Sequence, residues 1–294
     1  MFDYKKIRDE IENQGFSGPY KIFSNSDLEI IKKKIYNLSK TFFKDEKSIP
    51  LSENLTTKNI KKFNGNYASF VKSRIRKEIF KFGVQKKIIK IITNILEAKN
   101  PEFSDEFFDL RFNINENLYD KYSNKNNSKS TGITAWHQDA ETLYLNKYKA
   151  FNFDIVTVWI SLNSADVNNS MEILPKSNKA NRLYQQHYHD FREISEVSED
   201  FANSKSYKIK CKAGDVFFLH PLVFHRSIMN TSNHLRCSLD LRYFNPDKKK
   251  QNYKIDTLLR YNKMVHNFKE TKIFHLLIDS YLKIKSLTSK KRQY

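Results

Sequence analysis

The sequence predicts a mainly β protein with flanking helices, arranged as a β-sandwich or jelly roll. Three observations support this fold class. Apolar residues recur at helical spacing before about residue 100 and again after about residue 254, while the segments between them are short, rich in β-branched and aromatic residues, and separated by irregular polar loops. With 294 residues, of which 39% are hydrophobic, the chain can also fill a sizeable core.

Two long helices are expected near the start of the chain. In the stretch SNSDLEIIKKKIYNLSKTFF, Ser26 and Glu29 have the spacing of a capping box, and isoleucines and leucines then recur at the helical period. A second helix is expected from about Phe70 to Ala98, with a broad apolar face and with Gly83 as a weak point. Both helices are expected to serve packing rather than chemistry.

Strand-like segments follow from about residue 107. Four of them are FFDLRFNIN, FDIVTVWISL, YKIKCKAGDVFFLH and LRCSLDLRYF. Because no internal repeat and no clear linker interrupts the chain, a single domain is expected over residues 1–294. Within it, residues 1–100 would form a mainly helical support, 107–245 the jelly-roll core and 254–288 a C-terminal helical region.

The cysteine count and the apolar runs predict the compartment. Two cysteines, Cys211 and Cys237, cannot form a disulfide framework, and no run of eighteen or more apolar residues could span a bilayer. The first residues, MFDYKKIRDEIENQGF, are charged throughout and lack the apolar centre of a secretory signal. A cytoplasmic protein is therefore expected.

The net charge of +19 raises the question of a polyanionic partner such as nucleic acid. Lysine dominates the basic residues and is scattered through helix-like stretches rich in lysine, asparagine and isoleucine. Since only clustering on one face would give binding, we interpret the charge as surface composition, and a nucleic-acid partner is not expected.

A candidate metal site begins in the stretch AWHQDAET. Residues i and i+2 of a strand point to the same side, so His137 and Asp139 can both face inward. His225, which follows the turn and strand of AGDVFFLHPLVFH, supplies a third ligand from a distant strand. Two histidines and one carboxylate on one face of Fe(II) leave positions open for a chelating co-substrate and dioxygen, as in non-haem iron oxygenases.

Other histidines compete for these roles. His220 is a rival for the third ligand because it lies close to His225 in the sequence. His187 and His189, in YQQHYHDF, are expected to be loop residues instead.

A candidate anchor for the co-substrate lies eleven residues past His225, at Arg236. A dicarboxylic keto acid such as 2-oxoglutarate chelates iron at one end and leaves its far carboxylate to be held, which a guanidinium does with two parallel hydrogen bonds. Ser238 and Arg242 share the strand face of Arg236 by parity. Ser238 could therefore add a hydroxyl, and Arg242 is the second candidate for the anchor.

These residues stand in an order that resembles the phytanoyl-CoA dioxygenase-like (PhyH) family of Fe(II)/2-oxoglutarate oxygenases. The likeness runs from about residue 107 to 245 through LRFNIN, WHQDAETLYL, VTVWISLNSADVNNSMEILPKSNK, KAGDVFFLHPLVFHRSIMN and LRCSLDLRYFN. It implies a double-stranded β-helix, a cupin-like jelly roll, with His137, Asp139 and His225 as iron ligands and Arg236 as the co-substrate anchor. NNSMEILPKSNK departs from the usual Asn-Gly and Pro-Gly-Ser-His words of the family, which affects the expected substrate class rather than the iron chemistry.

The resemblance implies a hydroxylase that acts on a small-molecule metabolite and releases succinate and CO2. Related halogenases replace the carboxylate ligand with a small residue, whereas Asp139 is present here. Arg111 and Asn113, on one face of DLRFNIN, are candidates to contact the co-substrate or the substrate, and Trp136 and Trp159 are candidate apolar walls. An anionic substrate is among the candidates because the chain is basic.

Two other functions stay open. The two arginines of RCSLDLR resemble a motif of the AlkB-type demethylases, which would make the protein a nucleic-acid-directed oxygenase; the spacing from His225 to Arg236 fits the PhyH type better. The other alternative is a non-catalytic binding protein on the same fold.

Overall fold

A computed structural model of the chain describes residues 2–42, 65–115, 134–142, 154–181, 186–189, 191–194, 204–232 and 235–246. Its helices are α1 (Tyr4–Gln14), α2 (Asn25–Phe42), α3 (Gly65–Arg74), α4 (Arg76–Gly83), α5 (Lys86–Leu96), the short α6 (Asp139–Thr142) and the 3-10 helix η3 (Ser177–Ala180). Its strands are β1 (Phe16–Lys21), β2 (Glu102–Asn113), β3 (Ile155–Ser161), β4 (Met171–Leu174), β5 (Gln186–His189), β6 (Phe191–Ile194), β7 (Tyr207–Lys208), β8 (Asp215–Leu219), β9 (Phe224–Ser227) and β10 (Arg236–Phe244).

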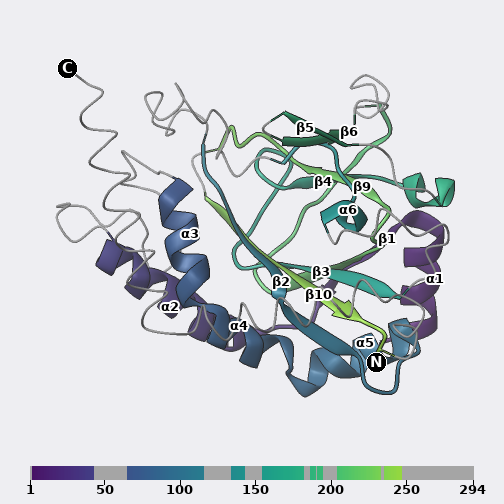
Figure 1. Cartoon of the computed structure of the whole chain (residues 1–294), viewed down its shortest axis with the longest axis horizontal. Coiled ribbons are helices and arrows are strands. Elements are labelled where there is room, and N and C mark those ends of the chain that lie inside the picture. Colours follow the sequence, from purple (N-terminus) through teal and green to yellow (C-terminus); the bar gives the residue numbers. More distant parts are fainter. Residues whose placement is uncertain are drawn as a thin grey trace.

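Two antiparallel sheets form the centre of the fold. The larger sheet has the strand order β1-β8-β3-β10-β2, the smaller one has the order β7-β4-β9, and β5 pairs with β6. Figure 1 shows helices α2 to α5 along one side of the larger sheet, with β4 and β9 on the opposite side and α6 between the two sheets. Two facing antiparallel sheets with flanking helices confirm the predicted double-stranded β-helix.

Alternation along the strands of the larger sheet separates an apolar face from a polar one. In β10, Cys237, Leu239 and Leu241 join the apolar core that the helices cover. The intervening Arg236, Ser238, Asp240 and Arg242 belong to the other face and are also buried. The same strand therefore supports the helical layer with one set of residues and supplies charged side chains to the interior with the other.

Helix α1 connects the helical layer to the smaller sheet. Its N-cap Asp3 accepts a hydrogen bond from the Lys6 amide, and it ends at Gly15, whose φ of 88° is left-handed. The Gly15 carbonyl then accepts a hydrogen bond from the His220 amide, at 2.8 Å, in the turn that leads to β9. A Cβ on Gly15 would lie 2.4 Å from Val223, so only glycine fits this close approach.

The helical region departs from the prediction in two places. Helix α2 begins two residues earlier than expected. The capping box is formed by Ser24, whose hydroxyl accepts from the Asp27 amide, and by Asp27, whose carboxylate accepts from the Ser24 amide. The sequence predicted a capping box of Ser26 and Glu29 instead. The single helix expected over 70–98 is three helices, α3, α4 and α5, broken at Ile75 and again after Gly83.

Other expectations concern boundaries and the membrane. Strand β2 begins at residue 102 rather than 107. The C-terminal helical region expected at 254–288 lies outside the described residues, so the domain boundaries stay a prediction. No helix in the described part of the chain is long and apolar enough to cross a membrane.

Candidate metal centre

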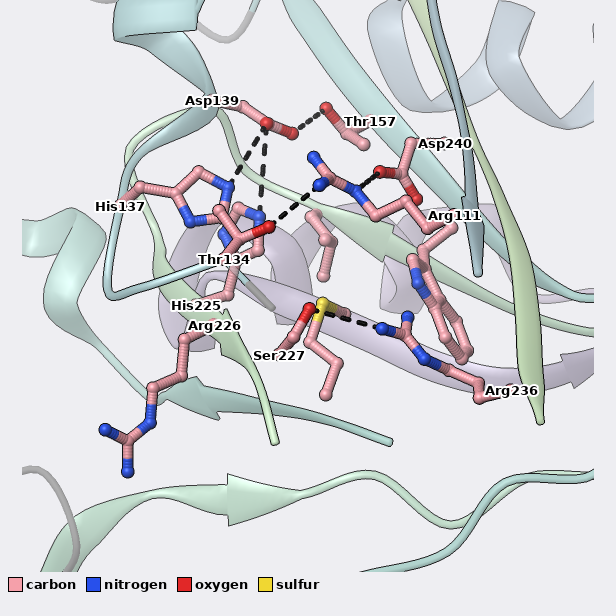
Figure 2. A pocket seen from close by; sticks show the side chains of 13 residues that line it. Arg111, Thr134, His137, Asp139, Thr157, His225, Arg226, Ser227, Arg236 and Asp240 are labelled. Atoms are coloured by element: carbon pink, nitrogen blue, oxygen red, sulfur yellow. Dashed lines mark hydrogen bonds and ion pairs between the residues drawn. The ribbon is translucent and has the colours of Figure 1, made fainter. Parts of the chain in front are cut away.

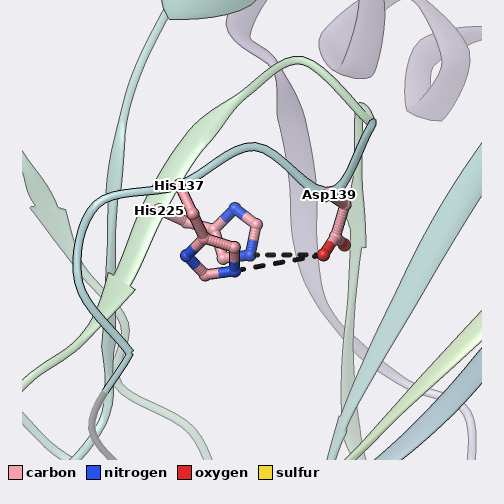
Figure 3. A group of neighbouring side chains, drawn as sticks. All are labelled: His137, Asp139 and His225. Carbon is pink, nitrogen blue, oxygen red and sulfur yellow. Dashed lines mark ion pairs between the residues drawn. The ribbon is translucent and has the colours of Figure 1, made fainter. Parts of the chain in front are cut away.

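Three buried side chains converge between the two sheets. One ligand atom from each of His137, Asp139 and His225 lies within 4.8 Å of the others. Oδ1 of Asp139 is 4.0 Å from Nε2 of His137 and 3.9 Å from Nε2 of His225. Figure 3 shows both imidazoles turned toward this carboxylate oxygen. Among the described residues, no other group of histidine, cysteine or acidic side chains comes together in this way.

The main chain holds the two histidines directly against each other. His137 and His225 form an isolated antiparallel bridge, with N to O distances of 3.1 Å and 3.2 Å in the two directions. The sequence predicted that Asp139 lies in a strand with His137, but Asp139 is instead the first residue of the short helix α6. The amide of Ala140 donates to the Pro221 carbonyl at 2.9 Å, which ties α6 to the turn before β9. His137 and Asp139 therefore face the same centre through a strand-to-helix turn.

Hydrogen bonds to the main chain determine which ring nitrogen of each histidine carries the hydrogen. Nδ1 of His137 lies 2.8 Å from the Ala135 carbonyl oxygen, and Nδ1 of His225 lies 3.1 Å from that of Val223. A carbonyl oxygen only accepts, so in the neutral ring Nδ1 carries the hydrogen and Nε2 keeps its lone pair toward the centre. Burial, and then the neighbouring His225, hold the pKa of His137 well below 6.5. A neutral imidazole is the form that binds metals.

Asp139 is ionised and held at both oxygens. Its Oδ2 accepts from the Thr157 hydroxyl at 2.6 Å, and its Oδ1 accepts from Nη2 of Arg242 at 2.9 Å. Burial alone would raise the pKa of this carboxyl group, but the positive charge of Arg242, together with the neighbouring histidines and the Thr157 hydrogen bond, lowers the pKa below its usual range. An anionic oxygen beside two imidazole nitrogens is a donor set suited to a divalent transition metal.

A narrow pocket opens from this cluster toward the larger sheet, with a cavity volume of about 10 Å³. This is far smaller than a typical small-molecule site, so a ligand that entered it would have to displace side chains of the pocket wall. It is lined by Arg111, Thr134, His137, Asp139, Thr157, Trp159, Met171, Leu219, His225, Arg226, Ser227, Arg236 and Asp240. Figure 2 shows Arg236 and Ser227 across the pocket from His137 and Asp139, while the side chain of Arg226 points away.

Arg236 lies at the far end of the pocket with only 1% of its surface exposed. Its Nη1 donates to the Ser238 hydroxyl at 3.0 Å and its Nη2 to the Ser227 hydroxyl at 3.2 Å, while its Nε has no partner. In the described part of the chain no carboxylate lies within ion-pair distance of this guanidinium. Burial accordingly lowers the pKa of Arg236 to about 10. The indole N–H of Trp159, on the same pocket wall, is a second buried donor without a partner.

Arg111 and Asn113 occupy different environments although they share a strand face. Arg111 lines the pocket, where its Nε donates to Asp240 at 2.9 Å and its Nη1 to the Thr134 hydroxyl at 2.8 Å. Asn113 does not line the pocket; its amide donates to the main-chain carbonyls of Asn169 and Ile228. Ser238 and Arg242 do not line it either, because Ser238 accepts from Arg236 and Arg242 binds Asp139 behind the pocket.

Histidines outside the cluster were the remaining alternatives. His220 lies outside the cluster, where its Nδ1 accepts from the Leu222 amide at 3.1 Å and burial lowers its pKa to about 4. His187 and His189 belong to strand β5, not to the loop that the sequence predicted. Trp136 lies 4.9 Å below the guanidinium of Arg226 and does not line the pocket.

The sequence motifs did not identify five polar residues of the pocket wall. They are Thr134, Thr157, Arg226, Ser227 and Asp240. For Ser227 and Asp240 a signal existed, because each shares strand parity with a predicted site residue, His225 in β9 and Arg236 in β10. Thr157 could be recognised only once the structure had placed β3 beside α6.

A family model described as phytanoyl-CoA dioxygenase (PhyH) matches residues 11–238. No curated protein matches the sequence significantly. Many solved structures match the fold. EvdO2 from Micromonospora carbonacea var. aurantiaca, complexed with 2-oxoglutarate, is 13% identical with a TM-score of 0.52, covering 83% of this chain and 91% of its own.

Two further solved structures have the same fold. EctD from S. alaskensis, in its apoform, is 12% identical with a TM-score of 0.52, covering 83% of this chain and 77% of its own. SnoK, a non-heme alpha ketoglutarate dependent carbocyclase from nogalamycin biosynthesis, is 16% identical with a TM-score of 0.50, covering 82% of this chain and 84% of its own. At such identities the likeness establishes the fold alone.

Proposed function

Since the chain belongs to the phytanoyl-CoA dioxygenase (PhyH) family of Fe(II)- and 2-oxoglutarate-dependent oxygenases, we propose that it hydroxylates a small-molecule metabolite. The observation that carries this proposal is a pairing of two features in one pocket. A buried cluster of two histidines and one carboxylate lies at one end, and a buried arginine without a carboxylate partner among the described residues lies at the other.

His137, Asp139 and His225 are the residues proposed to hold Fe(II). Their donor atoms already face a common centre, and the hydrogen bonds of each Nδ1 leave each Nε2 free to bind. Because burial keeps His137 neutral and Arg242 keeps Asp139 ionised, these two ligands have the protonation states that a divalent metal requires.

Arg236 is proposed to bind the far carboxylate of 2-oxoglutarate. A buried guanidinium without a nearby anion is unfavourable, as the lowered pKa of Arg236 indicates, and a carboxylate entering the pocket would relieve that cost. The Ser227 hydroxyl and the indole N–H of Trp159 lie on the same pocket walls and can donate to the same ligand. Arg236 can then form the paired hydrogen bonds that a guanidinium makes to a carboxylate.

Bound iron, 2-oxoglutarate and dioxygen would together supply an oxidant that removes a hydrogen atom from the substrate, with release of succinate and CO2. The protein's own contribution is to orient the ligands and to keep bulk water away. The buried ligand cluster and the apolar Met171 and Leu219 of the pocket wall serve the second purpose. Hydroxylation is favoured over halogenation because Asp139 is present as the third protein ligand, in the position where halogenases have a small residue.

The proposal is tested by an Arg236→Met variant, in which the charge is lost while the side-chain volume is largely kept. Removing one partner of a buried charge pair costs about 3–5 kcal/mol, equivalent to roughly a hundredfold or more in affinity for 2-oxoglutarate. Iron affinity should be unchanged, because Arg236 contacts none of the three ligands. Anaerobic titration of the Fe(II) protein with 2-oxoglutarate, followed by the charge-transfer absorption band, measures the affinity for 2-oxoglutarate, and anaerobic calorimetric titration of the metal-free protein with Fe(II) measures the affinity for iron.

The variant should fold, since no described carboxylate loses its partner with Arg236. Arg8→Met is a matched control, because Arg8 forms ion pairs with Glu12 and Glu97 on the helical side of the protein, away from the pocket. If Arg242→Met lost more 2-oxoglutarate affinity than Arg236→Met, the anchor would be Arg242. If the wild-type protein formed no 2-oxoglutarate complex, the proposed function would be wrong.

A further inference from the structure

Arg242 is buried beside the metal cluster but outside the pocket. Its side chain and that of Asp139 are each only 2% exposed, and they form an ion pair. Since Arg242 does not line the pocket, it is badly placed to bind a co-substrate that enters there. Its contact is instead with the carboxylate that is proposed to hold the iron.

The contact involves the oxygen of Asp139 that faces the two histidines. Nη2 of Arg242 lies 2.9 Å from Oδ1, and the same Oδ1 is 4.0 Å and 3.9 Å from the Nε2 nitrogens of the two histidines. The second oxygen, Oδ2, is held separately by the Thr157 hydroxyl at 2.6 Å. With a donor on each oxygen, the carboxylate cannot rotate without breaking one of two buried, charge-assisted hydrogen bonds.

The charge of Arg242 is balanced on its other side. Nη1 of Arg242 is 3.7 Å from Oδ2 of Asp109, which also forms ion pairs with Lys72 and Arg111. Burial would raise the pKa of Asp109, but Lys72 and the two arginines lower it below its usual range. Because Asp109 and Asp139 both lie beside the Arg242 guanidinium, they offset part of its positive charge, which weakens its repulsion of a metal cation.

We propose that Arg242 is a positioning residue, which fixes Asp139 so that only Oδ1 is directed to the metal. This inference rests on the proposed metal site and assigns no contact between Arg242 and 2-oxoglutarate. It predicts that Arg242 determines how the carboxylate coordinates, while Arg236 determines how tightly the co-substrate binds. Groups that orient metal ligands in this way typically change metal affinity by about 10–100-fold when they are removed.

The test compares Arg242→Met with the wild type, using Co(II) as a spectroscopic probe. The variant should bind Co(II) and Fe(II) about 10–100-fold more weakly. Its Co(II) absorption spectrum should differ in band position and intensity, because a freed carboxylate coordinates with a different geometry. At saturating metal the affinity for 2-oxoglutarate should equal that of the wild type. Arg8→Met again serves as the control and should resemble the wild type in all three measurements.

A second variant guards against loss of folding. Arg242→Met removes one of the three cations around Asp109, so the double variant Asp109→Asn/Arg242→Met removes one negative charge together with the positive one. If both residues act through Asp139, the double variant should bind metal no more weakly than Arg242→Met, because effects within one network are not additive. Arg242→Lys, which keeps the charge, should restore part of the metal affinity.

Two outcomes would overturn the inference. One is wild-type metal affinity and a wild-type Co(II) spectrum in a folded Arg242→Met variant. The other is a loss of 2-oxoglutarate affinity at saturating metal, which would make Arg242 a binding residue. Failure of the proposed function is distinguishable from both, because in that case the wild-type protein itself would bind neither metal nor 2-oxoglutarate.

Discussion

At the scale of single residues, the site depends on hydrogen bonds that orient each ligand and set its charge. Main-chain carbonyls accept from the Nδ1 atoms of His137 and His225, and Arg242 keeps Asp139 ionised. These contacts come from neighbouring backbone or from distant strands. The two imidazoles and the carboxylate are therefore arranged before any metal arrives, which limits the reorganisation that metal binding requires.

His225→Gln should remove metal binding, whereas His220→Gln should retain it. Two protein ligands seldom hold Fe(II) against water, and His225 supplies one of three converging donors. His220 is engaged with the Leu222 amide and lies outside the cluster, so it is the matched control. Calorimetric titration with Fe(II) under anaerobic conditions measures both variants. Metal binding that persisted without His225 and failed without His220 would exchange their roles.

The candidate ligands could be predicted from the sequence because spacing and order carry that information. His137 and Asp139 lie two residues apart, and His225 follows a recognisable turn and strand. The partners of these residues could not be predicted. Thr157 and Arg242 reach Asp139 only through the pairing of β3 with β10 and the position of α6, and pairing between distant strands leaves no local signal in one sequence.

At the scale of secondary-structure elements, the alternation within each strand was predictable and the helix ends were not. In β10, the residues that face the helices are apolar and those that face the smaller sheet are polar, as a period of two requires. Helix ends depend on side-chain contacts that compete within a few residues. At α2, Ser24 and Ser26 both precede an acidic residue by three positions, and Ser24 is the one that caps.

Asp27→Asn should destabilise the protein at neutral pH, with a difference that disappears in acid. Asp27 is hydrogen bonded to Lys87 and to Ser24, which lower its pKa to about 2. A lower pKa in the folded state stabilises the fold above the unfolded value of about 4, and this stabilisation is lost as the pH falls from about 4 towards about 2. Loss of a negative charge from the first turn of a helix costs about 0.3–1 kcal/mol.

Urea unfolding of both proteins between about pH 7 and about pH 2 measures this difference, because the window spans both the unfolded pKa of about 4 and the folded pKa of about 2. Glu29→Gln is the control, since Glu29 is an exposed acidic residue on the same helix, two positions further along. Equal effects of the two substitutions, or a difference between Asp27→Asn and the wild type that grew in acid, would contradict the assignment of Asp27 to the cap.

At the scale of the whole molecule, the fold keeps two kinds of charge apart. Around the pocket, arginines and carboxylates occur in equal number: Arg111, Arg226, Arg236 and Arg242 with Asp109, Asp139, Glu172 and Asp240. A divalent metal and a dianionic co-substrate would leave that balance unchanged. The excess of basic residues lies elsewhere, for example on helices α2 to α5, in which lysines and arginines outnumber acidic residues. These helices cover the side of the larger sheet that faces away from the pocket (Figure 1).

Binding to random-sequence duplex DNA should therefore be weak, diffuse and independent of the metal site. Non-specific binding has a Kd of about 10⁻⁴–10⁻⁶ M at physiological salt and falls steeply as salt rises, because each phosphate contact releases counterions. Lys77→Gln/Lys81→Gln on α4 and Lys205→Gln/Lys210→Gln near β7 each remove two exposed charges from different surfaces. If the charge is surface composition, fluorescence anisotropy should show equal, small losses of affinity for both double variants and no change on adding Fe(II) and 2-oxoglutarate. Tight, salt-resistant binding that only the α4 variant abolished would establish a dedicated polyanion surface and favour the nucleic-acid-directed oxygenase.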